Sequence, residues 1–141
     1  MGLLNEFFLA RNDDDARRAL PDGPTAGGFV EVVAASGLTN LQVELIEQAV
    51  TGRAGAPAGI GVLSIDDAPE GPWVIGFPSS VTDALLDVGE GQLEAVADRW
   101  VEAVARQGAD PSSLSGLLVD LVDLASTGAS SSRAPYLWIC L

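Results

Sequence analysis

Few residues in this chain could carry out chemistry, because histidine and lysine are both absent. The seven basic residues are all arginines, and there is a single cysteine. Without histidine the chain lacks an imidazole general base, an imidazole metal ligand and any Ser-His or Cys-His nucleophile pair. Without lysine it cannot form a Schiff base. Carboxylates, hydroxyls, arginines and one thiol remain for a catalytic or binding role.

Carboxylate pairs are the first of these groups to consider, since two carboxyl groups at a suitable separation can hydrolyse a glycosidic bond. The candidates are Asp66, Asp67, Glu70 and Glu90. Acidic proteins contain many such pairs by chance, and residues that are neighbours in sequence seldom converge on one substrate. A carboxylate-dependent enzyme is therefore the least favoured of three functional hypotheses, and no catalytic residue is predicted.

Two further features allow both a chemical and a structural interpretation. The acidic run at residues 12–15 could bind a metal ion, but Asn12 or Asp13 could equally cap a helix whose positive end the next aspartates would stabilise. We favour capping, because residues at a helix start point in different directions, and we predict no metal site and no cofactor. Cys140 lies in an apolar segment without the cationic setting that activates a thiol, so we predict a core residue.

The formal net charge of −13 limits the classes of partner. An anionic surface repels phosphate backbones and anionic lipid headgroups, so we expect neither nucleic-acid nor membrane binding. A basic protein is the natural electrostatic complement, although the charge could also serve only solubility. No apolar run has the length of a membrane span, and one cysteine provides no disulfide framework. A cytoplasmic location is therefore expected.

The favoured hypothesis is a noncatalytic acidic protein-binding module, such as an immunity-like or antitoxin-like inhibitor of a basic protein. Its predicted contact residues lie in an acidic loop and along the polar side of the helix that follows Glu90. The predicted partner-binding residues are Asp66, Asp67, Glu70, Glu90, Glu94 and Asp98. The second hypothesis is a small-ligand binding or sensing domain, in which the Gly/Pro-rich loop at residues 52–72 acts as a lid.

Strand-like patterns occur at both ends of the chain and between them. The predicted strands are EFFLA (6–10), FVEVV (29–33), PWVIGF (72–77) and YLWICL (136–141), with a shorter one at GVLSI (61–65). A strand of the YLWICL type would be buried on both faces if it were inserted between two neighbours. The C-terminal segment is therefore predicted to be structural.

Helical periodicity fills the rest of the chain. The predicted helices begin after Asn12, at the capping box of Thr39 and Gln42, at Ser79 or Ser80, at Gln92, and at Asp110-Pro111. The stretch STGASSSRAP at 126–135 is predicted to be a polar linker. One domain over residues 1–141 follows from the length, with an α+β fold: a small mixed β-sheet that includes the N- and C-terminal strands, covered by four to five amphipathic helices.

Four segments carry a family resemblance: MGLLNEFFLARNDDDARRAL, LQVELIEQAVTGR, GPWVIGF and YLWICL. They resemble small, acidic, lysine-poor uncharacterised proteins of high-GC Gram-positive bacteria. More distantly, the arrangement is similar to the YfbM-like family, in which an N-terminal aromatic segment and a C-terminal apolar strand frame a helical middle. The resemblance implies no catalytic residue that can be matched in this chain.

Overall fold

The computed structural model describes residues 4–20, 22–36, 40–52, 61–64, 72–106, 108, 114 and 116–140. Within these ranges the strands are β1 (Leu4–Ala10), β2 (Val32–Ser36), β3 (Gly61–Ser64), β4 (Trp73–Gly76) and β5 (Ala134–Cys140). The α-helices are α1 (Asp13–Ala16), α2 (Asn40–Thr51), α3 (Ser79–Leu86), α4 (Leu93–Arg106) and α5 (Leu117–Ser130). Two short 3-10 helices, η1 (Arg17–Ala19) and η2 (Glu90–Gln92), complete an α+β fold.

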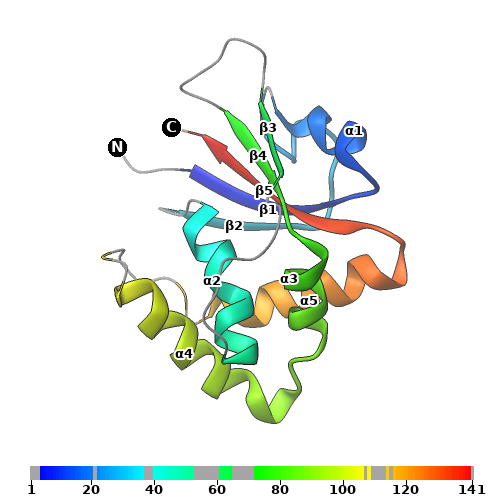
Figure 1. The fold of residues 1–141 in the computed structure, drawn as a ribbon. Coiled ribbons are helices and arrows are strands. Elements are labelled where there is room, and N and C mark those ends of the chain that lie inside the picture. Colours follow the sequence, from blue (N-terminus) through cyan, green and yellow to red (C-terminus); the bar gives the residue numbers. More distant parts are fainter. Residues whose placement is uncertain are drawn as a thin grey trace.

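The strands form one sheet in the order β2-β1-β5-β4-β3 (Figure 1). The predicted sheet with the N- and C-terminal strands is confirmed. Its predicted mixed character is wrong, because all four strand pairs of the described residues are antiparallel. The helices between β4 and β5 bring the chain back to the end of the sheet where β4 stops. β5 starts there and therefore runs antiparallel to β4.

The C-terminal strand β5 lies at the centre of this sheet. It pairs with β1 along seven residues and with β4 along four. Residues 135–139 are buried in succession, as expected for a strand that has a neighbour on both sides and a covered surface on both faces. The two ends of the described chain are therefore held side by side, and the prediction that the last segment is a buried strand is confirmed.

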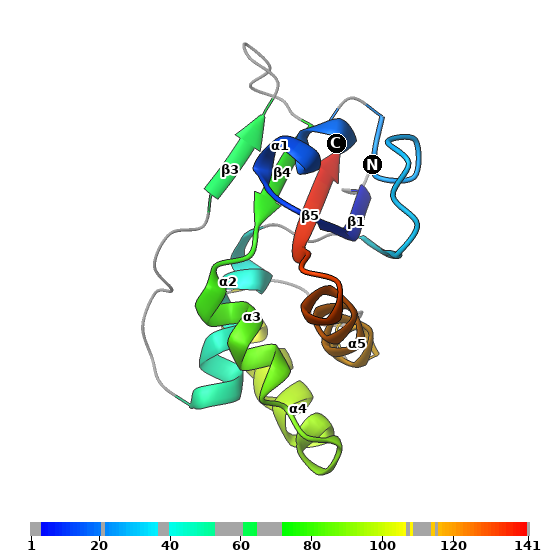
Figure 2. The ribbon, with the colours of Figure 1, turned by 90° about the vertical axis from the view of Figure 1, so that its right-hand side faces the viewer.

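The two faces of the sheet carry different layers. Phe7 and Leu9 of β1 pack into the large core formed with helices α2 to α5, whereas Phe8 and Ala10 pack into a smaller cluster with the segment around α1. Figures 1 and 2 show helices α2 to α5 gathered on one side and α1 on the other. None of the helices in the described parts of the chain has the length and apolar character needed to cross a membrane.

The predicted strand at 29–33 is shifted in the structure, where β2 begins at Val32. Phe29 instead packs from the loop onto Phe8 with a ring-centroid distance of 4.8 Å, and the Arg18 guanidinium lies 4.8 Å above the Phe29 ring. This aromatic contact fixes Phe29 over the sheet and leaves the strand to start afterwards.

The predicted linker at 126–135 is also wrong in its first half, because α5 continues through Ser130. The hydroxyls of Ser130 and Ser131 donate to the carbonyl oxygens of Ser126 and Thr127 at 3.1 and 2.8 Å. These serines therefore bond back to the helix instead of ending it. The predicted start of a helix at Ser79 or Ser80 is confirmed, because α3 begins at Ser79, but a serine cap is not formed: Pro78 precedes the helix without a side-chain cap.

Two of the predicted helix starts involve residues outside the described ranges. Thr39 and the Gln42 side chain lie outside the described residues, and so does Asp110-Pro111.

A tight turn connects α5 to β5 and depends on Gly128. The Gly128 carbonyl oxygen accepts hydrogen bonds from the backbone N–H groups of Ser131 and Arg133. A methyl group at Gly128 would lie 2.6 Å from the Arg133 carbonyl oxygen and 2.9 Å from the Leu9 side chain. The helix can approach the sheet this closely only because that methyl group is missing.

We expect Gly128→Ala to lower the free energy of unfolding by about 1–3 kcal/mol, because the backbone around Arg133 would have to move. Urea denaturation of the full chain measures this difference. Gly91→Ala is the matched control, since a methyl group at Gly91 would meet nothing within 4 Å. Equal stability of the two variants would show that the α5–β5 approach is not tight.

Candidate functional site

The six predicted partner-binding residues divide between described and undescribed parts of the chain. Asp66, Asp67 and Glu70 lie outside the described residues. Glu90 lies in η2, and Glu94 and Asp98 lie on α4, all three with exposed side chains. The structure therefore places half of the predicted set on one continuous segment of the helical side.

The charges of the molecule are divided unequally between its two sides. We call residues 40–51, 79–106 and 117–130 the helical layer, and residues 11–31 the α1 layer. The helical layer contains ten acidic residues, Glu44, Glu47, Asp83, Asp87, Glu90, Glu94, Asp98, Glu102, Asp120 and Asp123, but only two arginines, Arg99 and Arg106. The net negative charge is thus concentrated in the helical layer.

Arginines pair with three of the five acidic residues of the α1 layer, whereas Asp13 accepts from Tyr136 and Asp22 has no ion pair to a described residue. The ion pairs of this layer are Arg17–Asp14 at 2.6 Å, Arg18–Asp15 at 2.8 Å, Arg11–Asp15 at 3.7 Å and Arg133–Glu31 at 2.9 Å. The last pair is bidentate, with a second hydrogen bond of 3.1 Å, and joins the α1 layer to the residue before β5. Four of the seven arginines are used in this way.

The two arginines of the helical layer also have partners. Arg106 pairs with Glu102 one turn earlier on α4. The Arg99 Nε donates to the Ala49 carbonyl oxygen at 2.7 Å, in the last turn of α2. Both line a small pocket of about 170 Å³ between α2 and α4. Because helix C-termini are the negative ends of helix dipoles, this position explains both arginines structurally.

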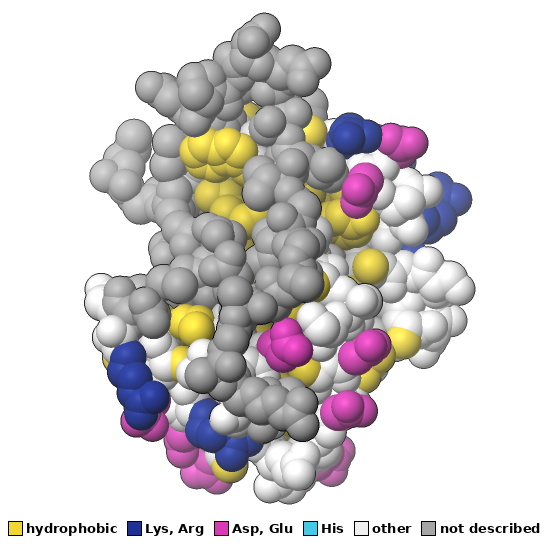
Figure 3. Space-filling view, in the orientation of Figure 1, with side chains coloured by type: hydrophobic (Ala, Val, Ile, Leu, Met, Phe, Trp, Pro, Cys, Tyr) yellow, Lys and Arg dark blue, Asp and Glu magenta, His cyan; other side chains and the backbone are white. Residues whose placement is uncertain are grey.

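Seven acidic residues of the helical layer therefore face solvent without an ion pair to any described residue. They are Asp83, Asp87, Glu90, Glu94, Asp98, Asp120 and Asp123. Arg53 is the one arginine outside the described ranges, and a single arginine cannot neutralise seven carboxylates. On the face shown in Figure 3, acidic side chains lie across the lower half, where Figure 1 places α3, α4 and α5.

The spacing of these acidic residues costs stability. Glu94 and Asp98 are four residues apart on α4, and Asp83 of α3 has the same separation from Asp87, the residue after that helix. Glu102 continues the row on α4 but is paired with Arg106. Like charges at this spacing destabilise a helix by about 0.2–0.5 kcal/mol per pair. The row on α4 extends about 12 Å along the helix axis at 1.5 Å per residue. A charged row of this kind is suited to contacting an extended surface of opposite charge.

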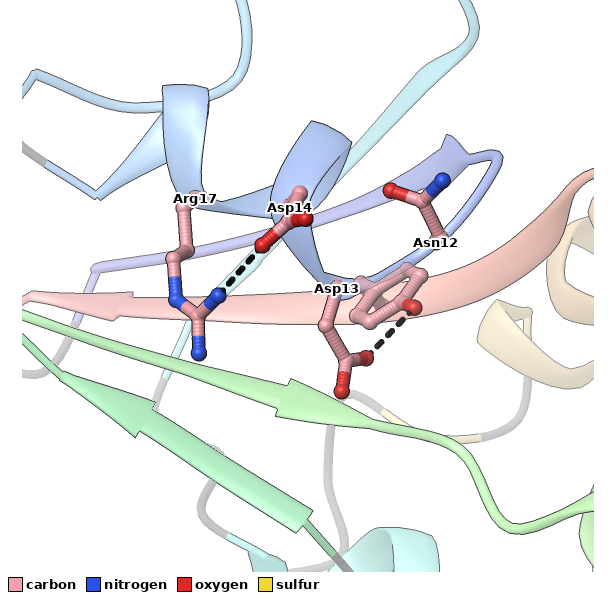
Figure 4. Close-up of a pocket in the computed structure, with 5 residues that line it drawn as sticks. Asn12, Asp13, Asp14 and Arg17 are labelled. Carbon is pink, nitrogen blue, oxygen red and sulfur yellow. Dashed lines mark hydrogen bonds and ion pairs between the residues drawn. The ribbon is translucent and has the colours of Figure 1, made fainter.

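A second group of acidic residues lies around α1, and its side chains bond to neighbouring residues of the protein. Asn12, Asp13, Asp14, Arg17 and Tyr136 line an open depression (Figure 4). The Tyr136 hydroxyl donates to Asp13 Oδ1 at 2.9 Å, while Asp14 accepts from Arg17. These groups satisfy one another across the depression. In the part of the chain that the structure describes, no three acidic or thiol side chains could hold a metal ion.

The start of α1 explains the acidic run in the sequence. Asn12 Oδ1 accepts from the backbone N–H of Asp15 at 2.9 Å, and Asp15 Oδ2 accepts from the backbone N–H of Arg11 at 3.0 Å. Asn12 is thus the cap, which confirms one of the two predicted alternatives. The hydrogen bond from Arg11 and the charges of Arg18 and Arg11 lower the pKa of Asp15 despite its partial burial.

Comparison with known proteins finds no matching family model, no matching curated protein and no matching solved structure. The similarity to the YfbM-like family therefore stays a prediction.

Sequence reasoning missed four of the seven unpaired acidic residues: Asp83, Asp87, Asp120 and Asp123. Their positions on the polar sides of α3 and α5 could have indicated exposure. The absence of arginine partners could not be read from the sequence, because pairs such as Arg133–Glu31 join residues far apart in the chain.

Tyr136 is the only tyrosine, so tyrosinate absorbance reports its ionisation alone. Burial and, second, the hydrogen bond to Asp13 raise its pKa above the ordinary value of 10.0. We expect the urea-unfolded chain to titrate near pH 10, whereas the folded protein develops no tyrosinate absorbance there. In the control variant Asp13→Asn, the pKa of Tyr136 in the folded protein should be lower than in wild type. Titration of the native protein at the unfolded value would contradict the Tyr136–Asp13 contact.

The pH dependence of stability should show the contribution of Asp15. Its pKa is lowered in the folded state, so its stabilisation is present above the unfolded value near 3.8 and is lost as pH falls through the folded value. Asp15→Asn should be less stable than wild type at neutral pH by up to about 1 kcal/mol, with the difference vanishing in acid. Urea titrations at a series of pH values measure this.

The control for Asp15→Asn is Asp22→Asn, which removes one exposed acidic residue without an ion pair in the described structure. If the difference in the free energy of unfolding between wild type and Asp15→Asn stayed constant down to strong acid, it would contradict the lowered pKa of Asp15.

Proposed function

We propose that this chain is a noncatalytic binding protein whose acidic helical layer docks onto a basic surface of another protein. The observation that carries the proposal is the segregation of charge. Arginines pair with three of the five acidic residues of the α1 layer, whereas seven of the ten carboxylates of the helical layer are exposed and have no ion pair with a described residue. A surface needed only for solubility gains nothing from leaving its like charges in rows.

Exposed apolar side chains within the helical layer support a protein partner. Leu86 of α3 is 41% exposed and lies beside Asp87, and Val119 of α5 is 43% exposed and lies beside Asp120. Protein interfaces combine apolar contacts with a polar rim, whereas a simple counterion needs no apolar contact. The partner would therefore present arginines or lysines around apolar positions of its own.

The chemistry of the partner follows from the sign of the field. A negative helical layer attracts a cationic protein and accelerates their encounter at low salt. A nuclease or another protein that binds phosphate backbones has such a surface, because it must attract an anionic polymer. Covering that surface would exclude the nucleic acid, as an immunity-like or antitoxin-like inhibitor does. The contact set combines the predicted Glu90, Glu94 and Asp98 with Asp83 and Asp87.

The test begins with the protein encoded beside this chain, because an inhibitor of this type is encoded with its target. Binding is measured by calorimetric titration at low and high salt. We expect Glu94→Gln combined with Asp98→Asn to weaken binding at least tenfold at low salt, with a smaller loss at high salt where charges are screened. Wild-type affinity should itself fall as salt rises.

The matched control is Asp14→Asn combined with Asp22→Asn, which removes two acidic residues from the α1 layer. This control should bind like wild type and keep its fold, since the exposed Asp14–Arg17 pair contributes little to stability. Equal loss of binding in both double variants would mean that only the overall charge matters. A neighbouring protein that is acidic, or that binds with no salt dependence, would contradict the proposal.

A further inference from the structure

The strand β2 forms one edge of the sheet. It pairs with β1 on one side, and the strand order places no described strand on the other. Ala34 in the middle of β2 is exposed, and Val32, Val33 and Ala35 are only partly buried. The outer N–H and C=O groups of such a strand are available for pairing with another chain.

This edge lacks the features that keep edge strands apart in monomeric proteins. Its sequence, VVAAS, contains no charged residue and no proline. Val30, two residues before the strand, is 83% exposed and is the most exposed large hydrophobic residue of the described chain. Two charged residues lie next to the strand: Glu31 pairs with Arg133, and the partly buried Glu6 lies opposite Ala34 on β1, on the inner side of β2. β2 itself thus carries no charged side chain, although the molecule is strongly acidic.

We propose that the β2 edge pairs with β2 of a second copy of this chain. Two molecules that each carry a charge of −13 repel each other least where few charges lie at the contact, and the outermost strand β2 has no charged side chain of its own. A basic partner would gain no electrostatic attraction there. Identical edge strands pair in antiparallel fashion around a two-fold axis, which closes the assembly at a dimer with one continuous sheet.

The dimer and the basic partner respond to salt in opposite directions. Salt screens the repulsion between two acidic copies and strengthens their association, whereas it weakens attraction between unlike charges. Self-association is measured with the purified chain alone. A chain that fails to self-associate would therefore not contradict the proposed acidic binding surface. A chain that fails to bind a basic partner would likewise not contradict the proposed dimer.

The experiment is sedimentation velocity of the full chain over a range of concentrations at low and high NaCl. We expect the mass to rise from 14.5 kDa toward twice that value, at lower concentration when NaCl is high. Ala34→Lys should stay monomeric, because a lysine on the edge would have to lose its hydration in the paired state. Its fold should persist, since Ala34 lies opposite Glu6 on β1. Val30→Lys, at a site outside the strand, should also weaken the dimer.

Ala95→Lys, at an exposed position on α4, is the control that makes the same change in net charge. It should dimerise like wild type, and thermal melts should show that each variant is folded. A wild-type chain that is monomeric at every concentration and salt would overturn the proposal. So would a dimer that persists in both Ala34→Lys and Val30→Lys, or one that Ala95→Lys disrupts equally.

Discussion

The structure depends on the pairing of β5 with strands on both of its sides. β1 and β4 reach each other only through this strand, and its side chains alternate between the two layers of the molecule. Leu137 and Ile139 enter the large helical core. Tyr136 and Trp138 enter the smaller cluster, where their polar atoms bond to Asp13 and to the Leu20 carbonyl oxygen. β5 thereby contributes to both layers, as its neighbours β1 and β4 also do, and it holds these two strands together.

The distribution of charge follows from the different construction of these layers. The helical layer has long amphipathic helices and a large apolar core, so burial of that core stabilises it without help from ion pairs. The α1 layer has only short elements, a four-residue helix among them, and holds to the sheet through capping, aromatic contacts and arginine pairs. With no lysine or histidine in the chain, arginines used there leave the helical carboxylates unneutralised.

The sequence predicts the parts of this fold that local patterns determine. The short, continuous apolar runs in EFFLA and YLWICL indicate strands that are buried on both faces, as β1 and β5 are, and the apolar face of α4 is visible in its spacing. Phe29 was assigned to a strand because its long-range contact with Phe8 does not show in the local pattern. The serine-rich end of α5 reads as a linker because the hydrogen bonds that hold it exist only once the helix has formed. For the acidic surface, the sequence predicts which carboxylates are exposed, because exposure follows from helical periodicity. It does not predict which of them lack an arginine partner, because the pairing of each arginine depends on the tertiary structure.

If the fold depends on β5, the pairing of β5 with its neighbours should be the last part of the structure to open. Native-state hydrogen exchange of the backbone amides tests this claim most directly. We expect the amides of β5 and β1 to exchange only through global unfolding, with the free energy obtained from urea denaturation, while the α1 layer opens at lower free energy. Exchange of the β5 amides at a free energy well below that of global unfolding would contradict the account.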